Sequence, residues 1–382
     1  MSRILIVPMG AMAETAGSLS RAVTLGKALK DSCHEVALCV SHDMNYKKPS
    51  GLKEYDLETP VPLGLPAAIG TRTFPIAQRL GITSRKEVRS FEEVLKLTGN
   101  SCYCYLCKSV DDIRTAARDF EADIIYSEFS ISAIIAAKLM GIRCFATVSF
   151  PTQSEFACTP SLSKDVNRYL RENGLPEVRS TLDLFKTPEK KFVPSIRELE
   201  PFEDGQVIYC GSWKTVNAII PSKSRNKILV YMGNGTISSK VMVKEVSEAF
   251  RGSQYEVYIA GKDLSESNDG NINTAPFFDF SKLLNESVLF INHGGQNSIV
   301  DGLVYSVPML ICPGKVFERK YNAESVVRCN AGSVIDHNSF NSSEIKEKAL
   351  TIIGDSSFAE SSSALGTKLT ELKGAATVAE FI

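Results

Sequence analysis

Short runs of apolar residues alternate along the chain with longer segments in which apolar residues recur at helical spacing. This alternation of strands and helices predicts an α/β protein with parallel sheets. The first elements are a strand over Arg3–Pro8, an amphipathic helix over Leu19–Lys30 and a strand over Val36–Val40. They form a βαβ unit, so we expect the chain to start with a doubly wound, Rossmann-like domain.

The same pattern continues through the first half of the chain. It predicts helices over 110–121 and 131–140, and strands over 123–127 and 141–147. Residues 42–99 follow no regular period and contain five prolines, which favours loops there.

A polar stretch around Pro221 separates this half from a second set of alternating elements, which starts with a strand over Lys227–Met232. Polar, proline-containing stretches between periodic segments are typical of linkers. We therefore expect a first domain over 1–213, a linker over 214–226, a second Rossmann-like domain over 227–363, and a terminal helix over 364–382 that can cross back to the first domain.

The composition fits two ordinary globular domains. The chain has 382 residues, of which 43% are hydrophobic and 23% charged, enough for two complete cores. A net charge of −1 predicts no nucleic-acid partner and no attraction to anionic membranes. No apolar run is long enough to cross a bilayer, and the first strand is too short for the core of a signal peptide, so we expect a cytoplasmic protein.

Most of the ten cysteines stand singly in apolar runs, where a reduced thiol behaves as a small core residue. Cys102, Cys104 and Cys107 are clustered, but no fourth metal ligand lies near them in the sequence. Chance clustering in a helix is therefore the favoured interpretation, and a metal or redox role stays open.

A glycine turn near the C-terminal end carries the clearest chemistry. An apolar run over 286–292 predicts a buried strand, Gly294 and Gly295 follow His293, and Ser298–Val304 predicts a helix. Unpaired amides at a helix start and the positive end of its dipole attract anions, and phosphate is the expected ligand. Asn297 and Ser298 are expected to cap the helix and to donate to phosphate oxygens.

Other polar residues are expected on the same rim of the sheet. Asp301 follows Ser298 by three residues, so it shares a helix face and can accept bonds from two sugar hydroxyls. Glu318 and Arg319 fall in the expected loop after a strand over 308–313. Thr236, after the glycines at 233 and 235, is well placed for a diphosphate, although those glycines also suit a plain tight turn.

These motifs resemble the donor-binding signature of family 1 nucleotide-sugar glycosyltransferases, which include plant UDP-glycosyltransferases and bacterial macrolide and antibiotic glycosyltransferases. The match runs in register from His293 through Asn297-Ser298, Asp301-Gly302, Val307-Pro308, Pro313 and Glu318 to Asn322-Ala323. It covers nearly all of the second domain and only the framework of the first. Ser306 replaces the glycine before Val-Pro, and Arg319 replaces a glutamine that contacts donor-sugar hydroxyls in the family.

The resemblance implies a GT-B architecture, in which two Rossmann-like domains face a central cleft. It also implies an inverting hexosyltransferase that moves a sugar from a nucleotide diphosphate sugar to an acceptor hydroxyl of a small molecule or natural product. The sequence contains no Asp-x-Asp metal motif, so we expect a metal-independent reaction with no cofactor beyond the nucleotide-sugar co-substrate. The acceptor, the donor sugar and the oligomeric state do not follow from the sequence.

The catalytic base is the main departure from the family. The family's Gly-His pair falls on Gly17-Ser18, so its catalytic histidine is missing. Glu128 stands at a strand end where the family carries the aspartate that orients the histidine, and it is the expected base, directly or through Ser18. Glu14 and His42 are weaker candidates, and a solvated strand end is an equally weighted interpretation of Glu128.

Three donor contacts are more specific expectations from the same resemblance. Phe277 or Phe278 aligns with the aromatic residue that stacks on the nucleotide base, and core packing is an equal alternative for either. Asp301 favours a ribose and hence a UDP-sugar over a dTDP-sugar. Arg319 suits a charged donor sugar such as a uronic acid, or is a surface charge.

Two other functions remain open. A hydrolase or epimerase of nucleotide sugars on the same architecture would explain the missing histidine. A non-catalytic partner that binds nucleotide sugar and supports another transferase would tolerate Ser18 as well.

Overall fold

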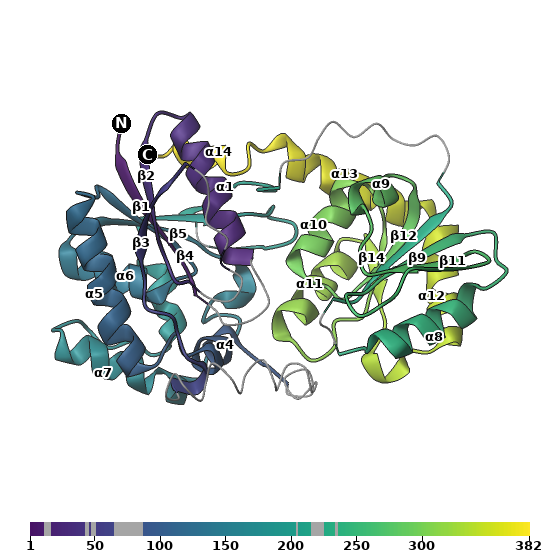
Figure 1. The fold of residues 1–382 in the computed structure, drawn as a ribbon, viewed down its shortest axis with the longest axis horizontal. Coiled ribbons are helices and arrows are strands. Elements are labelled where there is room, and N and C mark those ends of the chain that lie inside the picture. Colours follow the sequence, from purple (N-terminus) through teal and green to yellow (C-terminus); the bar gives the residue numbers. More distant parts are fainter. Residues whose placement is uncertain are drawn as a thin grey trace.

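The computed structural model describes residues 1–10, 17–42, 46, 51–64, 87–203, 205–214, 225–233 and 236–382. Within these residues the chain forms two α/β units that lie side by side, each built on a seven-stranded sheet (Figure 1). Both termini lie at the first unit.

The first sheet is parallel and has the order β3-β2-β1-β4-β5-β6-β7. Its central strands consist of apolar residues buried on both faces, as parallel strands covered by helices require. The strands are β1 (Arg3–Pro8), β2 (Glu35–Val40), β3 (Lys53–Asp56), β4 (Ile124–Glu128), β5 (Arg143–Thr147), β6 (Lys190–Val193) and β7 (Val207–Tyr209).

Alternate residues of β1 serve two different cores. Leu5 and Val7 pack on one face of the sheet with α4, α5 and α6, whereas Ile4 and Ile6 pack on the other face with α1 and α14. The helices of this domain are α1 (Gly17–Asp31), α4 (Phe91–Thr98), α5 (Tyr103–Asp119), α6 (Ile131–Met140) and α7 (Lys164–Glu172), with 3-10 helices at Pro62–Gly64, Phe150–Thr152, Pro160–Ser163 and Thr181–Lys186.

Two expectations for this domain were wrong. The region expected to be loops, 42–99, contains β3 and α4, and α4 is a capped helix: the Ser90 side chain accepts from the Glu93 amide, and Gly99 ends it at φ 87°. Helix α5 begins at Tyr103 rather than at residue 110, so the cysteine cluster lies at its start.

The second sheet has the order β10-β11-β9-β8-β12-β13-β14, and only the β10–β11 pair among its described strands is antiparallel. Its strands are β8 (Lys227–Tyr231), β9 (Glu256–Ala260), β10 (Ser267–Asp269), β11 (Ile272–Ala275), β12 (Ser287–Asn292), β13 (Met309–Ile311) and β14 (Gly332–Val334). Its helices are α8 (Ser239–Phe250), α9 (Phe280–Asn285), α10 (Gln296–Val304), α11 (Phe317–Arg328), α12 (Ser342–Gly354) and α13 (Ser356–Glu371), with a 3-10 helix at His337–Ser339.

The C-terminal segment connects the two domains a second time. Helix α13 runs along the second domain, and α14 (Ala376–Ala379) lies against α1 of the first (Figure 1). Ala375 and Val378 are buried in the same core as Ala22 and Leu25. Residues 215–224 of the expected linker lie outside the described residues.

A segment of the first domain also packs into the second. Ile196 and Leu199 are buried with the apolar residues of α10, α11 and α13. The Leu199 carbonyl accepts hydrogen bonds from the hydroxyls of Tyr321 and Ser325, both at 3.0 Å. The domains are therefore joined by a contact that is both apolar and hydrogen-bonded.

Candidate functional site

The candidate site lies between β8 and β12, where the order in which the chain adds strands to the second sheet reverses. From β8 the chain continues to β9 on one side, and from β12 it continues to β13 on the other. Neighbouring loops that leave a parallel sheet in opposite directions form a crevice at the carboxyl ends of their strands, where ligands of open α/β sheets bind. The loop after β8 contains Gly233, and the loop after β12 contains His293, Gly294 and Gly295.

Two hydrogen bonds fix the loop after β12. The Gly294 amide donates to Asn292 Oδ1 at 2.8 Å, and Asn322 Nδ2 donates to the Gly294 carbonyl at 2.9 Å. Gly294 has φ 78°, and a Cβ there would come within 2.9 Å of the Arg319 carbonyl oxygen. The loop therefore needs glycine both for its backbone conformation and for space.

Helix α10 begins at Gln296 with Gly295 as its N-cap, and no side chain caps it. The expectation that Asn297 and Ser298 cap the helix was therefore wrong, because they are its second and third residues. The amide N–H groups of the first turn have no acceptor within the helix, so they are free to donate hydrogen bonds into the crevice. Asn292 and Asn322, which hold the loop, received no role from the sequence, although Asn322 belongs to the motif that resembles the family signature.

His293 is a neutral hydrogen-bonding group. Burial, followed by the positive charge of Arg319, lowers its pKa to about 3, against a hydrogen bond to the Tyr231 carbonyl. Its ring lies against Gly233 and Gly295, where added Cβ atoms would come within 3.2 and 2.7 Å of it. His293 therefore serves as a donor or acceptor at neutral pH and not as a cation.

Glu318 and Arg319 belong to a helix rather than to the expected loop. Helix α11 starts at Phe317, whose amide donates to the Val88 carbonyl of the first domain at 3.0 Å. Glu318 is exposed, whereas Arg319 is only partly exposed, and burial lowers its pKa. Arg319 is therefore not a surface charge.

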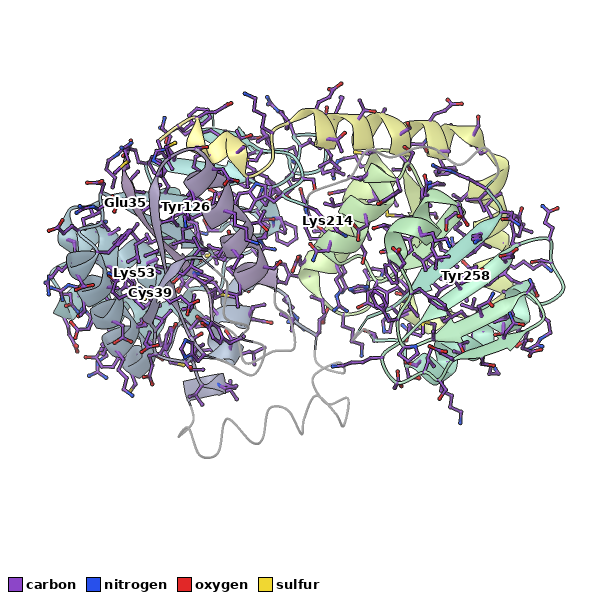
Figure 2. The ribbon with its side chains drawn as sticks, turned by 45° about the horizontal axis from the view of Figure 1, so that its top comes forward. Glu35, Cys39, Lys53, Tyr126, Lys214 and Tyr258 are labelled. Carbon is purple, nitrogen blue, oxygen red and sulfur yellow. The ribbon has the colours of Figure 1, made fainter. Side chains whose placement is uncertain are left out.

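Asp301 is buried on α10 and already has a cationic partner. Its Oδ1 lies 2.5 Å from Nζ of Lys214, the last described residue before the gap at 215–224. Burial raises the pKa of Asp301, and Lys214 opposes this shift. Lys214 lies where the two domains meet (Figure 2). The sequence placed it only in the linker, because nothing local marks a contact 87 residues away.

The two candidate aromatic residues differ in exposure. Phe277 is 78% exposed, and its ring is parallel to that of Phe280, with 6.5 Å between centroids. Phe278 packs edge-on against Tyr258 at 5.4 Å, at the border of the core. Of the two, only Phe277 therefore offers a free ring face. Phe278 fits the alternative in which the ring is part of the core.

Thr236 lies at the junction of two loops of the second domain. A Cβ on Gly314, in the loop after β13, would come within 2.1 Å of Thr236 Oγ1. Gly314 therefore allows the hydroxyl to reach this rim of the sheet. Residues 234–235 of the glycine turn lie outside the described residues.

In the first domain, Glu128 is paired with Arg21 and not with Ser18. Glu128 is fully buried, and its Oε1 lies 2.6 Å from Arg21 Nε. Its Oε2 is buried without a hydrogen-bond partner among the described residues. The interpretation of Glu128 as a solvated strand end was therefore wrong. The Ser18 hydroxyl donates to the Met9 carbonyl at 3.1 Å.

Arg21 was missed, although it follows Ser18 by one helical turn on the same face of α1. Its guanidinium also lies 5.4 Å from the centre of the Phe129 ring. Phe129 has φ 61°, which is rare for a bulky residue and points to local strain at this strand end. His42 pairs with Asp56 at 3.6 Å, and Glu14 lies outside the described residues.

A pocket of about 250 Å³ opens between the domains next to the start of α10. It brings together side chains from the first turns of α1 and α10 and from the segment before the linker. Its lining includes Arg21, Trp213, Lys214, Gln296 and Asn297.

The three cysteines of the cluster lie at the start of α5 and differ in exposure. Cys102 is the N-cap residue of α5 and is buried, Cys104 is exposed, and Cys107 is partly buried. Within the described ranges, no group of three or more His, Cys, Asp or Glu side chains is arranged to hold a metal ion. None of the helices in the same ranges is long and apolar enough to span a membrane.

Known proteins resemble this chain over part of its length. Residues 258–376 match the family described as erythromycin biosynthesis protein CIII-like, C-terminal domain. The uncharacterized UDP-glucosyltransferase YojK of Bacillus subtilis (strain 168) is 28% identical over 166 residues, 41% of this chain and 40% of that protein. UDP-glycosyltransferase 708G2 of Citrus unshiu is 27% identical over 177 residues, 42% of this chain and 35% of that protein. These matches span less than half of either relative.

Solved structures match over the full chain. Spinosyn rhamnosyltransferase SpnG is 16% identical with a TM-score of 0.72, over 100% of this chain and 99% of that one. The calicheamicin glycosyltransferase CalG4 is 14% identical with a TM-score of 0.74, over 100% and 97%. These structures confirm the expected GT-B fold. The matches to the family model and to the UDP-glucosyltransferase by sequence confirm the resemblance to family 1-type nucleotide-sugar glycosyltransferases.

Proposed function

We propose that the protein transfers a sugar from a nucleotide diphosphate sugar to a hydroxyl group of a small molecule, with inversion at the anomeric carbon. The bond between that carbon and the diphosphate breaks, a bond to the acceptor oxygen forms, and the hydroxyl proton goes to a base or to solvent. The observation that carries this proposal is the uncapped start of α10. It directly follows the Gly294 turn, at the point where the strand order of the second sheet reverses.

The chemistry of the donor side supports this assignment. Negative charge grows on the diphosphate as it leaves, so fixed donors stabilise the transition state more than the ground state. In our proposal the amides of 296–298, Ser298, Thr236 and neutral His293 supply those donors, and no metal ion is needed.

The nucleotide contacts follow from exposure and charge. Phe277 stacks on the base with its free ring face. Asp301 accepts from ribose hydroxyls after Lys214 has moved away, which favours a uridine nucleotide. SpnG has also been solved in complex with thymidine diphosphate, so uridine and thymidine nucleotides are both tested below.

On the acceptor side, Glu128 is the proposed base only if Arg21 releases it. Ser18, which stands where the family carries its catalytic histidine, is the observation behind a second candidate function, hydrolysis of the donor by water. Release of free sugar from the donor without any acceptor, at the rate seen with acceptors, would support hydrolysis.

The test is nucleotide binding to a Gly294→Ala variant. Calorimetric titration of the wild type with UDP and dTDP should show saturable binding of at least one of them. Gly294→Ala should weaken that binding at least about tenfold, because the added Cβ displaces the loop. Gly354→Ala is the matched control, since a Cβ there meets nothing within 4 Å. Undiminished binding by a folded Gly294→Ala variant, or no binding by the wild type, would overturn the proposal. Turnover with a donor in the presence of EDTA tests independence of metal.

A further inference from the structure

Three of the charged side chains around the crevice have a partner of opposite charge. Arg21 pairs with Glu128, Lys214 with Asp301, and Lys320 of α11 with Glu87 at 3.1 Å. Within the part of the chain that the structure describes, Arg319 has no ion pair and no hydrogen bond to its guanidinium. Its nearest carboxylate in sequence, Glu318, is exposed.

The surroundings of Arg319 make this imbalance costly. The residue is only partly exposed, and burial lowers the pKa of its guanidinium. The neighbouring imidazole of His293 is neutral and cannot compensate for it. A desolvated charge is tolerated when a partner arrives to pair with it, and such groups mark binding sites.

Arg319 lies beside the glycine loop and is not among the residues that line the interdomain pocket. A Cβ added at Gly294 would lie 3.5 Å from Arg319 Cβ, whereas the pocket is lined by Arg21, Lys214 and the first turn of α10. The donors proposed above for the diphosphate are neutral groups, namely the amides of 296–298, Ser298, Thr236 and His293. Arg319 is not one of them, so its charge is free to pair with a second anionic group of the donor.

We propose that Arg319 pairs with a carboxylate on the transferred sugar, so that the donor is a nucleotide diphosphate sugar acid. This inference rests on the proposed function and narrows its donor class. A planar guanidinium matches a carboxylate with two parallel hydrogen bonds, which gives both affinity and orientation. A neutral sugar would leave the guanidinium desolvated and unpaired.

The test compares acidic and neutral donors in calorimetric titrations. The wild type should bind UDP-glucuronic acid at least about tenfold more tightly than UDP-glucose, as expected for hydrogen bonds between charged groups. Arg319→Gln should remove this difference and change the affinity for UDP less than about threefold. If only thymidine nucleotides bind, dTDP-glucuronic acid, dTDP-glucose and dTDP replace them.

Lys320→Gln is the matched control, since it removes the neighbouring positive charge, which already has a partner in Glu87. It should keep the preference for the acid. Equal or tighter binding of UDP-glucose by the wild type would overturn the proposal. An equal loss of affinity for UDP and for UDP-glucuronic acid in Arg319→Gln would also overturn it, because Arg319 would then bind the diphosphate. Failure of every nucleotide to bind instead refutes the proposed function itself.

Discussion

Ser306 ends helix α10 in a backbone conformation that usually requires glycine. Its φ is 55°, its amide donates to the Leu303 carbonyl, and the Val307 amide donates to the Gly302 carbonyl, both at 2.8 Å. This pair of bonds is the Schellman arrangement, whose left-handed residue is most often glycine. The serine that departs from the family pattern therefore keeps the family's backbone turn under strain.

Replacing this serine should stabilise the protein. Ser306→Gly removes the steric strain between Cβ and the backbone. The energy of this strain exceeds the entropic cost of ordering a glycine on folding, so the free energy of unfolding should rise by roughly 0.5–1 kcal/mol. Urea-induced unfolding measures this change. Ser363→Gly, at an exposed position inside α13, should lower stability by a similar amount. A loss in both variants would show that Ser306 is not strained.

At this scale, the sequence predicts residues whose role follows from the backbone and misses those whose role follows from a distant partner. Gly294 could be recognised because a glycine turn between a strand and a helix is a local pattern. The Lys214–Asp301 and Arg21–Glu128 pairs join residues 87 and 107 positions apart. Single side chains do not disclose such partners, so Glu128 was assigned as a base without the guanidinium that holds it.

Among the elements, burial determined which ones could be predicted. Strands such as β1 and β4 are mostly apolar and buried because helices cover both faces, and the sequence predicts them directly. Strand β3 was missed because its residues, Lys53–Asp56, are mostly polar and half-exposed at the edge of the sheet. Glu318 and Arg319 were expected in a loop, whereas α11 starts at Phe317, beside a contact with Val88 of the first domain that the local sequence does not disclose.

Helix α4 is tied to the rest of the first domain by one buried carboxylate. Glu92 is 1% exposed. Its Oε1 accepts from the hydroxyls of Ser163 and Ser180 and from the Thr181 amide, and its Oε2 accepts from the Thr159 amide at 2.5 Å. The carboxylate therefore connects α4 to both 3-10 helices that flank α7.

An amide cannot replace this carboxylate. In Glu92→Gln the NH₂ group faces a donor wherever it is placed, so at least one buried donor loses its acceptor. We expect the free energy of unfolding to fall by about 2–3 kcal/mol, measured by urea-induced unfolding followed by circular dichroism. The exposed Glu324→Gln should change it by less than about 0.5 kcal/mol. A similar small change in Glu92→Gln would show that the network is not a major support.

For the whole molecule, the contact between the domains centres on an aromatic group and a buried acid. Phe150 of the first domain stacks on Tyr321 of α11 with 5.5 Å between centroids. Beside it, the carboxyl group of Glu200 is 3% exposed and accepts from the Phe150 amide at 2.8 Å. Burial raises the pKa of Glu200 to about 7, with the negative charge of Glu318 on the second domain adding to the shift.

This acid makes the domain contact sensitive to pH near neutrality. Because the folded state raises the pKa above its ordinary value of 4.5, folding favours the protonated form. The stabilising contribution of Glu200 is therefore complete below about pH 4.5 and is lost as the pH rises through about 7. Ionisation places an uncompensated charge between the domains, opposite Glu318.

Glu200→Gln should remove this dependence, because a glutamine stays neutral and can still accept from the Phe150 amide. The free energy of unfolding of the variant, relative to the wild type, should rise between pH 5 and pH 8 by on the order of 3 kcal/mol. Calorimetric scans across this range measure it and should also show the unfolding transitions of the two domains moving apart at high pH in the wild type alone. The exposed Glu203→Gln is the matched control and should follow the wild type. A difference in the free energy of unfolding between Glu200→Gln and the wild type that stays constant across the range would mean that Glu200 does not titrate near neutral pH. The contact between the domains would then be held by packing alone.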